Sequence, residues 1–334
     1  MQPDQAAELP EPDWSPPPLP PGFPRWKHFA WDGWDLEIPV DWDLGALELS
    51  SKGGYFRLDD EFEPRLMVKW QPLGGRFDPE KAIARYFRKQ PKTGELRPRI
   101  GASVPGISKA FKGLDHQTYT LASLSARTRT SWGVSAYCPK CERAFVVEMG
   151  TDSRSGEPER LVSRVLGSLR DHSGEQLTRW EAYGLSLDLP SELRAAGSRF
   201  QQGFVSLAAA ARGQRVEVSR WTLAAVHLAG RDLRSFLLGY LAKARNLPRL
   251  KIESAAVMSH PGCVFHSPRR LFEPVRARVR RTLALYNPAH TTGLIWHCAS
   301  TNRIFMLALG SNHANDIGAA RLLASRVRCC KVVY

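Results

Sequence analysis

The sequence predicts an α+β protein of two homologous repeats, each a mainly antiparallel sheet flanked by helices, after a disordered Pro-rich N-terminal arm. Three observations carry this prediction: apolar residues alternate with polar ones along most of the chain, a few segments have helical periodicity, and the two halves match each other. The length of 334 residues suits two domains. A composition of 43% hydrophobic and 24% charged residues excludes a collagenous, coiled-coil or wholly disordered chain.

Residues 1–24 form the arm, which is acidic and ends in DWSPPPLPPGFP. Consecutive prolines lack backbone donors and prefer the polyproline II conformation, so this segment cannot join a sheet or a helix. We interpret the arm as a solvated tail. Docking of its PPPLPP stretch into an aromatic groove of a partner is the alternative.

The internal duplication defines two repeats, which we place at residues 25–173 and 174–334. Each matching segment shows the period-two alternation of a strand, and the first pair stops at a proline. The matching pairs are Gly33–Pro39 (GWDLEIP) with Gly184–Pro190 (GLSLDLP), RLMVKW ending at Trp70 with VEVSRW ending at Trp221, and Gly133–Gly150 with Gly293–Gly310. The last pair is ungapped over 18 positions.

Four helices are expected at corresponding places in the two repeats. Each is predicted from a capping residue or a proline followed by an apolar stripe at helical spacing. The predicted starts are Asp78 with Pro79, Pro158, Asp232 and Asn315.

This order of strands and helices resembles the PsbP-like superfamily of α/β sandwiches. The resemblance rests on the strand-proline openings at Gly33–Pro39 and Gly184–Pro190, the strands ending at Trp70 and Trp221, and the closing helices. It implies a non-catalytic binding protein that attaches to a larger assembly. No site residue of that superfamily can be carried over, because its pattern includes no diagnostic motif.

The formal charge of +14 is concentrated in the second repeat. Residues 1–177 hold 24 basic and 25 acidic side chains, whereas residues 178–334 hold 23 basic and 8 acidic ones. The basic second repeat therefore predicts an acidic partner.

An arginine row lies where about 11 residues are inserted in the second repeat alone. On a strand, its alternating arginines would point to one face and could bind a nucleic-acid backbone or another acidic surface. A solvated edge strand, protected by charge from aggregation, is the alternative that stays open. The candidate binding residues are Arg269, Arg270, Arg276, Arg278, Arg280 and Arg281.

Cys138 and Cys141 enclose a two-residue turn, which is the spacing of half a tetrahedral zinc or iron site. No second CxxC completes the site, and Thr301 stands where the second repeat would have the partner of Cys298. We therefore favour a reduced structural hairpin without a cofactor, with a zinc site as the alternative. The neighbouring Cys329 and Cys330 are interpreted as packing residues.

Catalytic templates are absent: the sequence contains no GxxxxGK[ST], GxGxxG after a strand, HExxH or GxSxG. We therefore assign no catalytic residues and infer no specific small-molecule ligand; an active site assembled from residues distant in sequence stays open. The function predicted is a non-catalytic cytoplasmic binding or adaptor component with a protein partner. A nucleic-acid-binding protein and a metal or redox protein using the Cys138 pair are the alternatives. No apolar run approaches the length of a membrane span, so no membrane association is expected.

Overall fold

The structure is a computed structural model, and everything said below concerns the residues that it describes. These residues are 25–50, 53–74, 77–88, 99–112, 114–122, 130–151, 157–172, 176–211, 213–242, 250–267, 290–311 and 316–330. The predicted arm at 1–24 and the arginine row lie outside them.

A four-stranded central sheet joins the two repeats. It contains two hairpins in the order β11-β10-β1-β2. The strands are β1 (Trp26–Trp31), β2 (Trp34–Pro39), β10 (Leu177–Ala182) and β11 (Leu185–Pro190). The hairpins meet where β1 and β10 pair antiparallel, at Ala30 opposite Glu181.

Both hairpins turn on two residues in the left-handed region, where glycine is favoured. In the first hairpin these are Asp32 (φ 48°) and Gly33 (φ 93°), and in the second Tyr183 (φ 49°) and Gly184 (φ 67°). This shared geometry makes Asp32 equivalent to Tyr183, so that Ala30 and Glu181 are equivalent residues too. The central sheet thus pairs a residue with its own counterpart.

The first repeat contributes a seven-stranded antiparallel sheet in the order β3-β4-β5-β9-β8-β7-β6. Its strands are β3 (Asp43–Ser50), β4 (Gly53–Asp59), β5 (Pro64–Pro72), β6 (Arg99–Ile100), β7 (Asp115–Ala122), β8 (Thr130–Cys138) and β9 (Arg143–Thr151).

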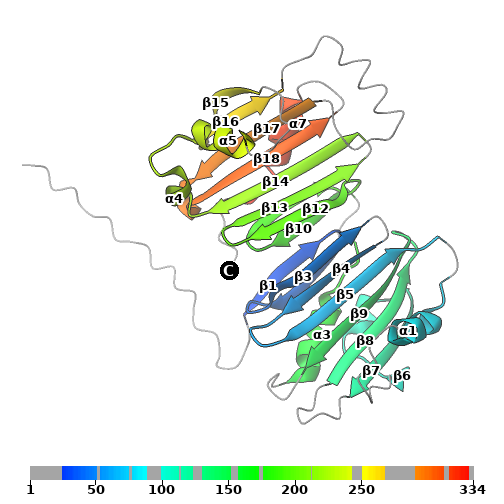
Figure 1. Ribbon diagram of the computed structural model, residues 1–334. Coiled ribbons are helices and arrows are strands. Elements are labelled where there is room, and N and C mark those ends of the chain that lie inside the picture. Colours follow the sequence, from blue (N-terminus) through cyan, green and yellow to red (C-terminus); the bar gives the residue numbers. More distant parts are fainter. Residues whose placement is uncertain are drawn as a thin grey trace, which may run out of the picture.

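The second repeat contributes a sheet with the same strand order, β12-β13-β14-β18-β17-β16-β15. Its strands are β12 (Arg194–Gln201), β13 (Phe204–Ala211), β14 (Gln214–Thr222), β15 (Lys251–Val257), β16 (His260–His266), β17 (His290–Cys298) and β18 (Arg303–Ser311). Figure 1 shows the two large sheets on either side of the central strands β1 and β10.

The strand register corrects one part of the internal sequence match. Trp70 pairs with Phe145 in the first repeat, whereas in the second repeat Arg220 pairs with Phe305 and Trp221 with Ile304. Because Phe145 and Phe305 coincide in the ungapped match, Arg220 occupies the place of Trp70. A slip of one residue moves a side chain to the other face of a sheet, so Trp221 packs instead against the helix that covers the outer face.

The helices are short and lie on the faces and ends of the two large sheets. They are α1 (Pro79–Arg88), α2 (Ile107–Ala110), α3 (Pro158–Ser168), α4 (Ala224–Leu228), α5 (Leu233–Ala242) and α7 (Ile317–Ala324), with the 3-10 turn η2 (Ala299–Thr301). The four helices expected from the sequence are confirmed as α1, α3, α5 and α7. The cap of α7 is Asp316, whose side chain accepts a hydrogen bond from the Ala319 amide; the predicted cap, Asn315, lies outside the described residues.

The predicted helix-flanked α+β sandwich is wrong: the described chain is mostly antiparallel β structure in three sheets. The difference arises because each opening hairpin leaves its own repeat and pairs with the other hairpin. One hydrophobic core then runs through both repeats and the central sheet, including Trp31, Trp34 and Trp180. Periodicity identifies strands, but it does not show which strands pair across a duplication. None of the described helices combines the length and apolar character needed to cross a bilayer.

Candidate metal centres

The first repeat brings four potential metal ligands together at one end of its sheet. Cys138 ends β8, Cys141 lies in the turn before β9, and Asp171 and His172 follow α3. One ligand atom from each lies within 4.8 Å of all the others. The Cys138 Sγ is 3.7 Å from His172 Nδ1, the Cys141 thiol donates to Asp171 Oδ2 at 3.3 Å, and Asp171 Oδ1 is 2.8 Å from His172 Nδ1. We call these four residues the first cluster.

Backbone pairing positions the half of this cluster that lies far from the CxxC turn in sequence. After α3, Arg170 exchanges two backbone hydrogen bonds with Asp35 of β2, at 2.8 and 3.0 Å. This bridge fixes the chain immediately before Asp171 and His172. The two residues therefore reach the cysteines because α3 ends against the central hairpin.

Burial and the neighbouring carboxylate determine the protonation of the two thiols. Burial raises the pKa of Cys138, and the Asp171 carboxylate raises it further. Burial and the same carboxylate raise the pKa of Cys141 far more. Both thiols are therefore neutral near pH 7 without a metal, and a metal that binds them must displace their protons.

The second repeat holds a cluster of three cysteines and one histidine. Cys298 ends β17, His260 begins β16, and Cys329 and Cys330 follow α7. The His260 Nε2 lies 3.3 Å from Cys329 Sγ and 3.2 Å from Cys330 Sγ. The Cys330 Sγ is 3.5 Å from that of Cys329 and 3.8 Å from that of Cys298. Sulfurs bound to one tetrahedral zinc at about 2.3 Å would be about 3.8 Å apart, so this second cluster has the size of a zinc site.

The thiols of the second cluster have pKa values that differ in direction. Burial alone would raise the pKa of Cys298, but its hydrogen bonds with Ser300, Thr301 and Cys330 outweigh this effect and lower the pKa. Burial and the hydrogen bond with Cys330 raise the pKa of Cys329 to about 12. Cys298 therefore loses its proton at a lower pH than an ordinary thiol, whereas Cys329 needs a nearby cation to ionise near neutral pH.

The two clusters occupy equivalent places in the two repeats. Cys138 and Cys298 coincide in the ungapped match. The Arg328 amide donates to the Ser186 carbonyl of β11, just as the Arg170 amide donates to Asp35 of β2. Counting onward from these bridges, Asp171 and His172 correspond to Cys329 and Cys330. The duplicated fold thus places ligand-type side chains twice at the same location, although the residue types differ.

The structure brings some of the sequence-predicted site residues together, whereas others lie outside the part of the chain that it describes. Cys138 and Cys141 lie with two further ligand-type side chains, Asp171 and His172. Cys329 is buried, as its interpretation as a packing residue requires, whereas Cys330 is exposed, so that interpretation is wrong for Cys330. Both cysteines belong to the second cluster. The six candidate arginines lie in residues 268–289, outside the described part of the chain. The signal that sequence reasoning missed is the recurrence of ligand-type pairs directly after the closing helix of each repeat.

Zinc binding at the first cluster should be strongly pH-dependent. The raised pKa values of Cys138 and Cys141 mean that two protons leave when the thiolates form. The apparent affinity should therefore fall by up to about a hundredfold for each pH unit of acidification. Competition with a chromophoric chelator between about pH 6 and about pH 8, in a C298S variant that isolates this cluster, measures the slope. A flat profile would show that the thiols do not bind the metal.

Comparisons with known proteins assign no family. No family model matches the chain, and no curated protein matches it in sequence. Among solved structures, the apo structure of the immunity protein TplEi of the T6SS from Pseudomonas aeruginosa aligns at 11% identity and a TM-score of 0.32. That alignment covers 91% of this chain and 96% of that one, and a TM-score this low carries no argument. The PsbP-like resemblance stays a prediction.

Proposed function

We propose that this chain is a non-catalytic zinc-binding protein that holds one zinc ion in each repeat. The observation that supports this proposal best is the recurrence of a four-ligand cluster at equivalent places of a duplicated fold. A single cluster of thiols can arise from packing alone. Two clusters of different residue types at equivalent places in the two repeats are better explained if each binds the same kind of metal ion.

The donor atoms favour zinc over other cations. Thiolate and imidazole ligands suit a borderline-soft ion, whereas calcium and magnesium require oxygen ligands. The second cluster offers three sulfurs and one nitrogen, and the first offers two sulfurs, one nitrogen and one carboxylate oxygen. Four protein ligands fill a tetrahedral zinc and leave no open position for substrate, so the proposed role is structural.

The proposed zinc ions would join segments that are distant in sequence. In the first repeat the ion would connect the turn between β8 and β9 to the segment after α3. In the second repeat it would connect β16 and β17 to the segment after α7. Each closing helix would then be tied to the sheet that it covers.

A binding role for the assembled protein remains part of this proposal. Zinc would stabilise the two repeats, and the basic second repeat would meet an acidic partner, as the charge distribution predicts. Whether the arginine row binds nucleic acid instead stays a prediction.

Metal analysis of the full chain tests the proposal. Protein purified without added metal is expected to contain two equivalents of zinc, since both sites are formed entirely by the chain. The C138S and C298S variants should each lose one equivalent, and the double variant should lose both. Inductively coupled plasma mass spectrometry, with thiol titration on the same samples, gives the stoichiometry.

Cys263 provides a matched control because it is a buried free cysteine that belongs to neither cluster. A C263A variant should retain both equivalents of zinc. Substoichiometric zinc in the unmodified protein, or a disulfide joining Cys138 to Cys141, would contradict the proposal. Equal zinc loss in C263A would show that the loss reflects unfolding rather than a missing ligand.

A further inference from the structure

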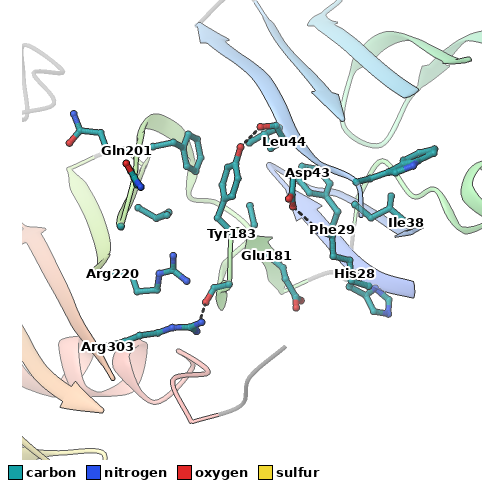
Figure 2. A pocket seen from close by; sticks show the side chains of 18 residues that line it. His28, Phe29, Ile38, Asp43, Leu44, Glu181, Tyr183, Gln201, Arg220 and Arg303 are labelled. Carbon is teal, nitrogen blue, oxygen red and sulfur yellow. Dashed lines mark hydrogen bonds and ion pairs between the residues drawn. The ribbon is translucent and has the colours of Figure 1, made fainter. Parts of the chain in front are cut away.

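A cavity of about 650 Å³ opens beside the central sheet and contains two arginines of the second repeat (Figure 2). Its walls come from β1, the chain around Trp42 to Leu44, and the turn between β10 and β11. The turn between β12 and β13 completes them. Arg220 of β14 and Arg303 of β18 lie together on one side. Both repeats therefore build the cavity, but the second repeat supplies its paired cations.

Arg220 is a buried cation without a counterion in the described chain. Only 6% of the residue is exposed, and its Nε has no hydrogen-bond partner among the residues that the structure describes. Burial and the neighbouring Arg303 guanidinium lower its pKa to about 10, so it remains charged at neutral pH. Within the described part of the chain, the side-chain hydrogen bond of Arg303 goes to the Gly184 carbonyl, at 3.5 Å.

The carboxylates that line the cavity have other partners. Asp43 forms an ion pair with Lys27 at 2.7 Å. Burial raises the pKa of Glu181, and the cations that oppose this rise are Arg179, Arg328 and His28. Neither carboxylate neutralises the arginine pair.

In the first repeat, the charge of the equivalent arginine is neutralised by a neighbouring carboxylate. Arg143, the counterpart of Arg303, forms a buried ion pair with Asp32 at 2.8 Å. Its guanidinium also lies 5.9 Å from the ring of Trp70. The arginine of the first repeat is therefore paired with a carboxylate and covered by an aromatic ring.

The second repeat replaces both of these neutralising neighbours. Tyr183 stands in the place of Asp32, and its hydroxyl donates to the Leu44 carbonyl. Arg220 stands in the place of Trp70, as the strand register shows. The first repeat has one cation paired with one carboxylate, whereas the second has two cations with no carboxylate partner among the described residues. A buried charge is costly unless it is paired, so this change points to an external anion.

We propose that the cavity binds a phosphate-class oxyanion, carried by a small phosphorylated molecule. Two adjacent guanidinium groups match phosphate oxygens through bidentate hydrogen bonds. A phosphate monoester carries about −1.5 to −2 charges at neutral pH and so balances the pair better than a carboxylate. The volume is that of a small-molecule site. This inference does not depend on the zinc ions.

Inorganic phosphate is the probe for a first test with the full chain. Phosphate should bind and raise the unfolding midpoint in a concentration-dependent way, whereas acetate at equal ionic strength should have little effect. The R303Q variant should bind phosphate about tenfold more weakly or worse, because a charge-assisted hydrogen bond is lost. R220M should lose the response too, and its midpoint without phosphate should rise because the unpaired buried charge is gone.

Two further variants make the result decisive. Y183D restores the carboxylate of the first repeat at a backbone position that aspartate tolerates, so it should fold and compete with phosphate. R321Q, at an exposed position of α7, should bind phosphate like the unmodified protein. Calorimetric titration measures all of these affinities. Undetectable phosphate binding, unchanged binding in Y183D, or an equal loss in R321Q would overturn the proposal.

Discussion

Removing zinc with a chelator is expected to lower the unfolding midpoint of this protein by roughly 8–16 °C. An ion present at a thousand times its dissociation constant stabilises the repeat that holds it by about 4 kcal/mol. For a repeat of about 150 residues each kcal/mol changes the midpoint by roughly 2–4 °C, so the range given is the effect of one ion on its own repeat. The effect should be large here because each cluster connects a closing helix to the sheet that it covers.

Differential scanning calorimetry with and without chelator measures this shift. The double variant C138S and C298S is the control, since it has lost one cysteine of each cluster and should not respond to the chelator. An unmodified protein that unfolds at the same temperature in both conditions would rule out a structural metal. Recovery of the midpoint on adding zinc distinguishes metal loss from irreversible damage.

Replacing Asp32 by asparagine is expected to lower the free energy of unfolding by about 3–5 kcal/mol. The Asp32 carboxylate pairs with Arg143 at 2.8 Å, and both side chains are almost fully buried. Asparagine would keep the size of the side chain and an acceptor for the Ala195 amide, which donates to Asp32 Oδ1 at 3.2 Å. It would nevertheless leave the buried guanidinium without a counterion. The decrease in the free energy of unfolding should therefore be that expected when one partner of a buried ion pair is removed.

Urea denaturation of the two proteins measures this difference. D43N is the matched control, because Asp43 pairs with Lys27 at the surface and its side chain is 67% exposed. Such surface pairs contribute about 0–1 kcal/mol, so D43N should unfold close to the unmodified protein. Equal losses in D32N and D43N would show that burial does not govern the Asp32 pair.

The strands and helices could be predicted from local patterns, whereas their assembly could not. Alternation predicted the strands ending at Trp70 and Trp221, and a first-turn proline predicted α1 and α3. The central sheet depends on the pairing of two hairpins that are distant in sequence, in the register of Ala30 opposite Glu181, which leaves no periodic signal. The one-residue slip that places Arg220 in the position of Trp70 is likewise a property of strand register.

Two of the four residues of the first cluster could be predicted from the sequence. The spacing of Cys138 and Cys141 identified two candidate ligands, because a short turn brings two nearby residues together whatever the rest of the fold does. Asp171 and His172 join them only after α3 has packed and ended at the central hairpin. In the second repeat, His260 comes from a different strand than any ligand of the first. No spacing rule could have selected it.

The pairing of Ala30 with Glu181 gives the central sheet a local two-fold symmetry. A contact in which each residue meets its own counterpart is the hallmark of a two-fold symmetric dimer. The chain therefore forms within one polypeptide the type of interface that two identical subunits form between them. Because both halves of this interface belong to one chain, they can differ at a single equivalent position, as Asp32 and Tyr183 do.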